Sequence, residues 1–258
     1  MKTVLLGYGD ILRRVYHLLN NRNRQLITVS RSTDHHPDPD NAISLDLSAR
    51  PELAGVFSRA DTVIYTPTPI NREVSGYQQG YLDTVEHLIK FLDPSTRLIL
   101  VSSTRVYRGY ADRVVNDDDT PLPADPQGRI LARMEQVASE RDNTVILRPS
   151  GIYGRSYTRW EKLALGTAPS TRVGNRIHAD DLAEIIRLMT EFAEPERSYL
   201  CSDLEPASEA DIWKFLCGGE VPLKPPEGGL RYQPTRLIAS GFKFRFPSYR
   251  EGLSEIKQ

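Results

Sequence analysis

Two glycines near the start of the chain have the spacing of a phosphate-binding turn. Gly7 and Gly9 flank Tyr8, directly after the apolar run 2–6 and directly before a helical pattern over 11–19. The first glycine permits a tight turn, and the second lets the backbone approach a pyrophosphate at the positive end of the helix. An ordinary strand-to-helix turn that needs a glycine gives the same pattern, so both interpretations stay open on this stretch.

Three side chains that can exchange a proton are further candidates for chemistry. Tyr107 and Tyr153 each come soon after a strand end and could reach a cleft. His178 lies between Arg176 and Asp180, and an imidazole can carry a proton near neutral pH. The alternatives are aromatic packing for the two tyrosines and a structural hydrogen bond for His178.

Alternating strands and helices must position these groups. The sequence predicts strands at 2–6, 25–30, 42–46, 61–65, 97–102, 144–148 and 198–201. It predicts helices at 11–19, 72–92, 127–140, 180–189, 209–216 and 234–239, with a shorter helical piece near 160–165. Repeated strand–helix units with apolar strands indicate an α/β fold, a doubly wound parallel sheet covered by helices on both faces.

The change of pattern after the sixth of these strands predicts two parts. Residues 1–150 form a dinucleotide-binding domain, and 151–258 are mostly a small C-terminal substrate lobe, with 176–203 returning to the first domain. A connector rich in proline and glycine covers 222–229. The cleft between the parts is the expected ligand site, because ligands bind outside the carboxyl ends of the strands.

Composition sets further bounds. The 258 residues are 39% hydrophobic and 26% charged, as in an ordinary globular protein. A net charge of −1 favours neither nucleic acid nor a membrane surface, and no apolar run is long enough for a membrane span. The chain enters its first strand without a signal-peptide pattern, and Cys201 and Cys217 suggest neither a disulfide framework nor a zinc site. We expect a cytoplasmic protein.

Four segments in order along the chain resemble one family, the extended short-chain dehydrogenases/reductases of the NAD-dependent epimerase/dehydratase group. Segment 101–107 resembles its S-S-x-x-V-Y-G stretch, 147–154 its R-P-x-x-x-Y-G stretch, and 175–183 its I-H-V-D-D-L-A stretch. Segment 246–253 is similar to the C-terminal segment of the small atypical members. The resemblance implies a Rossmann sheet, a nicotinamide dinucleotide and chemistry on a small-molecule substrate.

The chain departs from the family pattern in two places. Leu12 stands where the third glycine of G-x-G-x-x-G is usual, which questions the packing of helix on strand. Counting back from Glu135, Gln127 and Leu131 stand where the family has its catalytic Tyr and Lys. In the family the Tyr donates or accepts a proton and the Lys lowers its pKa. Glutamine has no useful acidity and leucine carries no charge, so the usual mechanism cannot be carried over whole.

The resemblance retains one catalytic position. Ser103, four residues before Tyr107, occupies the family's Ser/Thr position, where a hydroxyl bonds the substrate oxygen. Its alternative role is a turn hydroxyl that caps free backbone groups at the strand end. With Ser103 polarising the substrate, the proton would come from Tyr107, from His178 or from water.

The resemblance also implies cofactor contacts. Asp46 and Leu47 resemble the family's adenine-contacting pair, although Asp46 could instead cap a helix that starts near Pro51. The loop after the 61–65 strand should pass under the cofactor's ribose. The predicted cofactor-binding residues are Gly7, Tyr8, Gly9, Asp10, Ile11, Ser30, Arg31, Ser32, Asp46, Leu47, Thr66, Pro67, Thr68, Ser102, Arg148 and Pro149.

The end of the second strand favours NADP(H) over NAD(H). An NAD-specific site places a carboxylate there for the ribose 2′-hydroxyl, whereas this chain has Ser30, Arg31 and Ser32. Arg31 can pair with a 2′-phosphate, and a surface arginine facing water is the alternative. His35 and His36 follow in a loop and are predicted to be exposed. The five histidines show no metal-ligand spacing, and the run 117–119 is predicted to be a solvated loop face.

The leading hypothesis is an NADP(H)-dependent oxidoreductase that transfers hydride to or from a small carbonyl, imine or hydroxyl substrate. One alternative is a non-catalytic dinucleotide-binding sensor or partner protein, which the missing Tyr and Lys support. The other is an NAD-dependent sugar epimerase or dehydratase, which the short C-terminal lobe disfavours. A homodimer is compatible with these features, and no nucleic-acid or membrane partner is expected.

Overall fold

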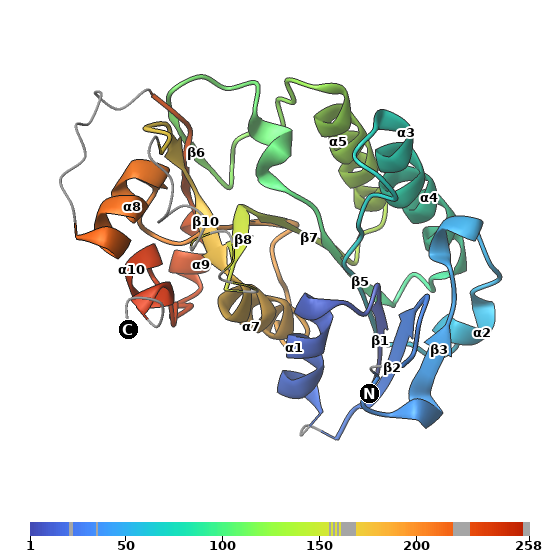
Figure 1. Ribbon diagram of the computed structural model, residues 1–258. Coiled ribbons are helices and arrows are strands. Elements are labelled where there is room, and N and C mark those ends of the chain that lie inside the picture. The colour runs from blue at the N-terminus through green and yellow to red at the C-terminus, as the bar shows by residue number, and fades with distance from the viewer. Residues whose placement is uncertain are drawn as a thin grey trace.

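The computed structural model describes residues 1–20, 23–34, 36–154, 156, 158, 160, 169–218 and 228–254. Seven parallel strands form its central sheet (Figure 1). In spatial order they are β3 (Ala42–Ser44), β2 (Gln25–Ser30), β1 (Lys2–Leu6), β4 (Thr62–Tyr65), β5 (Arg97–Val101), β7 (Thr144–Pro149) and β11 (Ser198–Cys201). The chain order reverses between β1 and β4, the position at which such sheets bind ligands. The predicted doubly wound α/β fold is confirmed.

Helices cover both faces of the sheet because alternate strand residues point to opposite sides. Leu5 packs in a core with α1 (Asp10–Leu19) and α7 (Ala179–Met189), whereas its neighbours Val4 and Leu6 pack in the core that includes α5 (Pro126–Ser139). Leu12 is fully buried in the α1 layer. A leucine at the usual third-glycine position is therefore accommodated by the helix-on-sheet packing.

The long helix predicted over 72–92 is interrupted. It consists of α3 (Val74–Tyr77), a π-helical segment (Gln78–Asp83), α4 (Thr84–Leu88) and a 3₁₀ turn (Ile89–Phe91). The Tyr65 hydroxyl donates to the Gly80 carbonyl at 3.1 Å, and a Cβ on Gly80 would lie 2.6 Å from the Thr68 carbonyl oxygen. The π segment therefore lets the helix backbone lie against the loop that follows β4.

Three pairs of short strands lie outside the central sheet in the described part of the chain. The pairs are β6 (Val114–Asn116) with β13 (Arg231–Gln233), β8 (Gly151–Tyr153) with β10 (Arg176–His178), and β9 (Val173–Gly174) with β12 (Ala207–Ser208). Figure 1 shows the helices α8 (Glu209–Cys217), α9 (Thr235–Ala239) and α10 (Tyr249–Gly252) grouped at this end. The remaining short helices are α2 (Ala54–Phe57) and the 3₁₀ turns Pro39–Asn41, Leu47–Ala49 and Thr104–Tyr107.

Asp117 corrects the prediction of a solvated face at 117–119. Its side chain is only 3% exposed. One carboxylate oxygen accepts from the Leu200 backbone at 2.5 Å, and the other accepts from the Thr235 hydroxyl and the Arg236 backbone, each at 2.9 Å. The carboxylate thus ties β11 and α9 to the loop after β6.

Some predictions fall on residues outside the described ranges. These are most of the helical piece at 160–165, most of the connector at 222–229, and His35. Within the described part of the chain, no helix has the length and apolar character needed to cross a membrane.

Candidate functional site

The two glycines of the turn differ: the fold requires a glycine at Gly7, whereas Gly9 has open space beside it. Gly7 has a φ of +78°, and a Cβ there would lie 2.8 Å from the Thr66 carbonyl oxygen. A Cβ on Gly9 would meet only the Gly7 carbonyl oxygen, at 3.7 Å. Among the described residues no side chain caps the N-terminus of α1 at Gly9. The space over Gly9 can therefore admit an anionic group to the backbone N–H groups of the first helical turn.

A cavity of about 260 Å³ opens beside this turn at the carboxyl ends of β1, β2 and β4. It brings together most of the predicted cofactor residues: Gly7, Tyr8, Gly9, Ser30, Arg31, Asp46, Leu47, Thr66, Pro67 and Thr68. Asp46 accepts from the Ser48 backbone at 3.0 Å and from its hydroxyl at 2.7 Å, and these bonds lower the pKa of Asp46. It caps the 3₁₀ turn at Leu47–Ala49, not a helix near Pro51.

A second hollow of about 290 Å³ shares Tyr8, Ser30 and Arg31 with the first and adds Arg13, Ser32 and His36. The prediction of an exposed His36 is wrong, since only 9% of this residue is exposed. Its ring bonds the Thr28 hydroxyl at 2.6 Å and the Ser30 hydroxyl at 2.7 Å. Thr28 and Ser30 are two apart on β2 and so share one face, which lets one imidazole bridge both.

Three predicted cofactor residues point into the interior. Ile11 packs in the α1 core, and Ser102 and Pro149 are buried. Asp10 instead lines the large cleft described below and pairs with Arg14 at 3.3 Å. The turn therefore gathers its ligand-facing groups from the backbone and from the ends of β2 and β4.

Arg148 and Tyr107 form a buried network with Glu135. Arg148 donates to one Glu135 carboxylate oxygen through Nε at 3.1 Å and Nη2 at 2.9 Å, and through Nη1 to the Tyr107 hydroxyl at 2.5 Å. Tyr107 is 0% exposed, and burial raises its pKa to about 12. These positions differ from two expectations, because the Arg148 guanidinium is buried and bonded within the protein and the Tyr107 phenol does not reach the cleft.

The His178 side chain is also buried and bonded within the protein. It is 4% exposed, its Nδ1 accepts from the Asp180 backbone at 3.2 Å at the N-terminus of α7, and its ring centroid lies 3.7 Å from that of Phe246. The Tyr153 ring packs against the His178 ring, with the centroids 5.1 Å apart, and its hydroxyl donates to the Ser248 carbonyl at 3.1 Å. Tyr153 nevertheless lines the large cleft described below, as expected, whereas the buried His178 takes the structural alternative, as the cap of α7.

Ser103 lies at the end of β5, half-buried and next to Thr104, which lines the cleft. Its Oγ accepts from the Arg105 backbone at 3.2 Å, so it caps the 3₁₀ turn, and its own O–H stays available as a donor. Leu131 is buried in the core, and Gln127 accepts from Arg105 Nη2 at 3.4 Å. An amide bonded to a guanidinium therefore occupies the position where the family has its acid.

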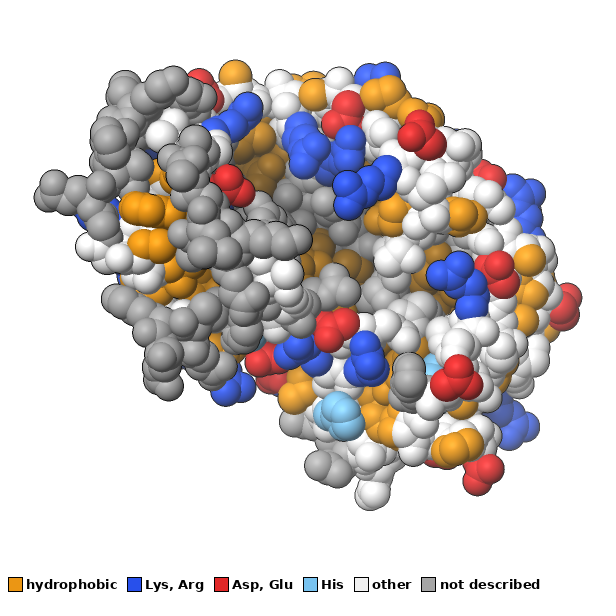
Figure 2. All heavy atoms as spheres, in the orientation of Figure 1, with side chains coloured by type: hydrophobic (Ala, Val, Ile, Leu, Met, Phe, Trp, Pro, Cys, Tyr) orange, Lys and Arg blue, Asp and Glu red, His pale blue; other side chains and the backbone are white. Residues whose placement is uncertain are grey.

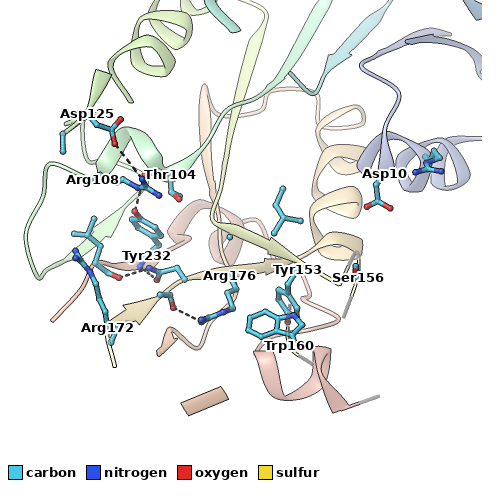
Figure 3. A pocket seen from close by; sticks show the side chains of 18 residues that line it. Asp10, Thr104, Arg108, Asp125, Tyr153, Ser156, Trp160, Arg172, Arg176 and Tyr232 are labelled. Atoms are coloured by element: carbon cyan, nitrogen blue, oxygen red, sulfur yellow. Dashed lines mark hydrogen bonds and ion pairs between the residues drawn. The ribbon is translucent and has the colours of Figure 1, made fainter. Parts of the chain in front are cut away.

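A cleft of about 1,110 Å³ opens between the first turn of α1, the Thr104–Tyr107 turn and the short paired strands, and Figure 2 shows this face hollowed. Figure 3 shows its lining side chains, which come from α1, the Thr104–Tyr107 turn and the β8, β10 and β13 strands. Most of these side chains were not predicted from the sequence as site residues. The missed side chains are Arg13, Arg108, Asp125, Ser156, Trp160, Arg172, Arg176 and Tyr232.

Asp203 lies next to this cleft and was also missed. It is 1% exposed, and in the described part of the chain neither carboxylate oxygen has a hydrogen-bond partner. Its backbone N–H donates to the Arg176 carbonyl at 2.6 Å. Burial raises the pKa of Asp203 to about 8, with Arg176 opposing the shift. The signal in the sequence is only a polar residue two positions after the end of a strand.

The raised pKa of Asp203 has a consequence for stability. Between its ordinary value of 3.8 and about 8, the native state holds a proton that the unfolded state has released. The free energy of unfolding from this group therefore falls as pH rises through that window, by about 1.4 kcal/mol per pH unit. We expect Asp203→Asn to flatten the pH dependence measured by urea unfolding. Asp142→Asn, at a fully exposed carboxylate, is the control, and equal slopes for wild type and Asp203→Asn would contradict the assignment.

No cluster of three or more His, Cys, Asp or Glu side chains in the described residues is arranged to hold a metal ion.

Known structures share this architecture. No protein-family profile matches the sequence, and no curated protein matches it significantly. A protein from Methylobacillus flagellatus, provisionally named an NAD-dependent epimerase/dehydratase, is 24% identical with a TM-score of 0.84, over 100% of this chain and 99% of that one. The human epimerase family protein SDR39U1, solved with NADPH, is 18% identical with a TM-score of 0.76, over 100% and 99%. UDP-glucose 4-epimerase from Thermotoga maritima is 17% identical with a TM-score of 0.75, over 98% and 96%. At these identities the likeness establishes a common fold.

Proposed function

We propose that the protein is an NADP(H)-dependent oxidoreductase acting on a small carbonyl, imine or hydroxyl substrate. The open space over Gly9, at the topological switch of the sheet, carries the proposal. The names of the similar structures support it, because they include an NAD-dependent epimerase/dehydratase and a protein solved with NADPH. When bound, the nicotinamide would supply the hydride.

The residues present fit such a cofactor. The first turn of α1 would hold the pyrophosphate, Asp46 and Leu47 would contact the adenine end, and the loop after β4 would lie under a ribose. Arg31 is exposed at the end of β2, where it can meet a 2′-phosphate. The preference for NADP(H) over NAD(H) is part of the proposal.

Isothermal titration with the oxidised and reduced forms of both dinucleotides tests cofactor binding. Arg31→Ala is expected to weaken NADPH much more than NADH, because only NADPH carries the 2′-phosphate that a guanidinium binds. Arg133→Ala, at an exposed arginine of α5, is the matched control. Equal losses for both cofactors would refute the role of Arg31, and no binding of any form at millimolar concentration would refute the proposed function.

Ser103 would polarise the substrate oxygen from the end of β5. Tyr107 and His178 are buried and bonded within the protein, so the proton would come from water in the open cleft. Ser103→Ala is expected to lower turnover by about a hundredfold while NADPH binding stays nearly intact. Ser103→Thr keeps both hydroxyl and cap and should restore most of the activity, which separates catalysis from loss of the cap. Unchanged turnover in Ser103→Ala would exclude this role.

A non-catalytic dinucleotide-binding protein is the second candidate. Gln127 and Leu131 favour it, since neither can replace an acid at this position. Cofactor oxidation with a panel of carbonyl and imine substrates distinguishes the two. Dinucleotide binding without turnover of any substrate would favour the second candidate.

A further inference from the structure

Arginine is the prevailing charged residue in the large cleft. Four arginines and two aspartates line it: Arg13, Arg108, Arg172, Arg176, Asp10 and Asp125. Figure 2 shows Lys and Arg side chains gathered along one rim of the hollow. A cleft lined by one sign of charge concentrates ligands of the opposite sign. The protein as a whole has a net charge of −1, so this excess belongs to the site and not to the overall composition.

Both carboxylates have an arginine partner that does not line the cleft. Asp10 pairs with Arg14 at 3.3 Å, and Arg14 also pairs with Asp180. Asp125 accepts from Arg105 Nε at 2.9 Å and from the Gly128 backbone at 2.7 Å, as the N-cap of α5. The two aspartates therefore offset only part of the charge of the four arginines that line the cleft.

The four arginines differ in what they already bind. Arg176 is buried, donates to the Ala207 carbonyl at 2.6 Å, and lies over the Trp160 ring at 5.6 Å. It belongs to the floor of the cleft. Arg108 is 58% exposed in its side chain, and its ion pair is a long one, 3.8 Å to the carboxylate that Arg105 already holds.

Arg172 is exposed, and no ion pair joins it to a carboxylate in the described part of the chain. Figure 3 shows Arg108 and Arg172 on the side of the cleft that Tyr232 lines, with Asp10 on the other side. The Tyr232 hydroxyl donates to the Thr104 carbonyl at 3.2 Å, so this side adjoins the Thr104–Tyr107 turn, which Ser103 caps. The exposed guanidinium groups of Arg108 and Arg172 therefore lie on the side of the cleft that this turn borders.

We propose that the substrate carries a compact anionic group, a carboxylate or a phosphate, and that Arg108 and Arg172 bind it. A planar guanidinium presents paired N–H donors that match the oxygens of either anion. This proposal rests on the proposed function for the reaction and names the substrate class of the same site, a small carbonyl compound with an anionic group. Binding of the anion itself depends only on the cleft.

The first experiment measures anion binding without turnover. Inorganic phosphate and malonate are titrated, by NMR or calorimetry, into the Arg31→Ala protein, which removes the exposed arginine of the dinucleotide cavity. We expect millimolar binding that weakens about tenfold or more when Arg108→Gln and Arg172→Gln are combined. Arg133→Gln on α5 is the control and should change nothing. Absence of binding, or binding that the double variant leaves intact, would overturn the proposal.

The second experiment distinguishes the anion and tests the substrate class. NADPH oxidation is compared for dihydroxyacetone and its phosphate, and for ethyl pyruvate and pyruvate. The expected preference for the phosphate or the carboxylate member identifies the anion, and the double variant should raise KM for that member about tenfold or more with little change for its neutral partner. Equal KM changes for anionic and neutral substrates would count against the proposal. Anion binding without NADPH oxidation would instead contradict the proposed function alone.

Discussion

Glu135→Leu is expected to lower the free energy of unfolding by about 3–5 kcal/mol, because it leaves a buried guanidinium without its counter-ion. The side chains of Glu135 and Arg148 are only 4% and 9% exposed, and both bonds from Arg148 end on the same carboxylate oxygen. Urea unfolding near neutral pH measures the loss. The charge of Arg148 cannot be shed by deprotonation at this pH, so the penalty must appear as instability.

A second variant separates charge burial from lost packing. Adding Arg148→Met to Glu135→Leu should recover most of the lost stability, since a well-packed apolar pair often replaces a buried ion pair at little cost. The exposed pair Arg197–Asp142 is the control, and breaking it should cost less than about 1 kcal/mol. If Glu135→Leu alone has the same free energy of unfolding as the double variant, the stability of the core does not depend on this ion pair.

Gly9→Val is expected to abolish dinucleotide binding at millimolar concentration while the protein stays folded. Gly9 is the N-cap of α1, and a Cβ there has no neighbour closer than 3.7 Å. The protein therefore tolerates the side chain, at a cost of about 1 kcal/mol for a poor N-cap residue. The branched side chain would fill the space over the first helical turn that a pyrophosphate needs. Calorimetric titration measures the binding, and thermal unfolding checks the fold.

Gly7→Ala is the matched comparison and should behave in the opposite way. Its φ of +78° and the Thr66 carbonyl oxygen 2.8 Å from the added Cβ make the change costly to the fold itself. We expect the melting temperature to fall in Gly7→Ala and to stay close to wild type in Gly9→Val. If Gly9→Val binds NADPH normally, the turn is structural only and the cofactor site lies elsewhere.

The long elements could be predicted from the sequence because each has a strong period or a buried apolar run. β2 (Gln25–Ser30) and β11 (Ser198–Cys201) have the predicted bounds, and α5 is displaced by one residue. Strands of two or three residues, such as β8 and β9, carry too few positions to show alternation. The π segment could not be predicted because its contacts with Tyr65 and Thr68, which lie outside the helix, are seen only in the folded structure.

The candidate site also has one part that could be predicted from the sequence and another that could not. The cofactor cavity could be predicted because the backbone at strand ends defines it, and strand ends are what the sequence pattern locates. The directions in which the side chains of Tyr107, Arg148 and His178 point could not be predicted, since the same sequence motif is compatible with a side chain in the core or in the cleft. His36 and Asp117 were missed because loops fold back on partners that only the assembled structure brings near. The cleft arginines come from segments far apart in the chain.

The buried network of Glu135, Arg148 and Tyr107 bears on how motifs persist during evolution. Tyr107 and Arg148 belong to two segments that resemble the dehydrogenase family, and Glu135 anchors the alignment that exposes the missing Tyr–Lys pair. Breaking this network would expose mutants to unfolding whatever reaction the protein performs. Selection for stability alone can therefore preserve these three residues while the catalytic Tyr and Lys are replaced. A protein could change its reaction and still carry the sequence motifs of its ancestor, because these motifs encode a buried network that stabilises the fold.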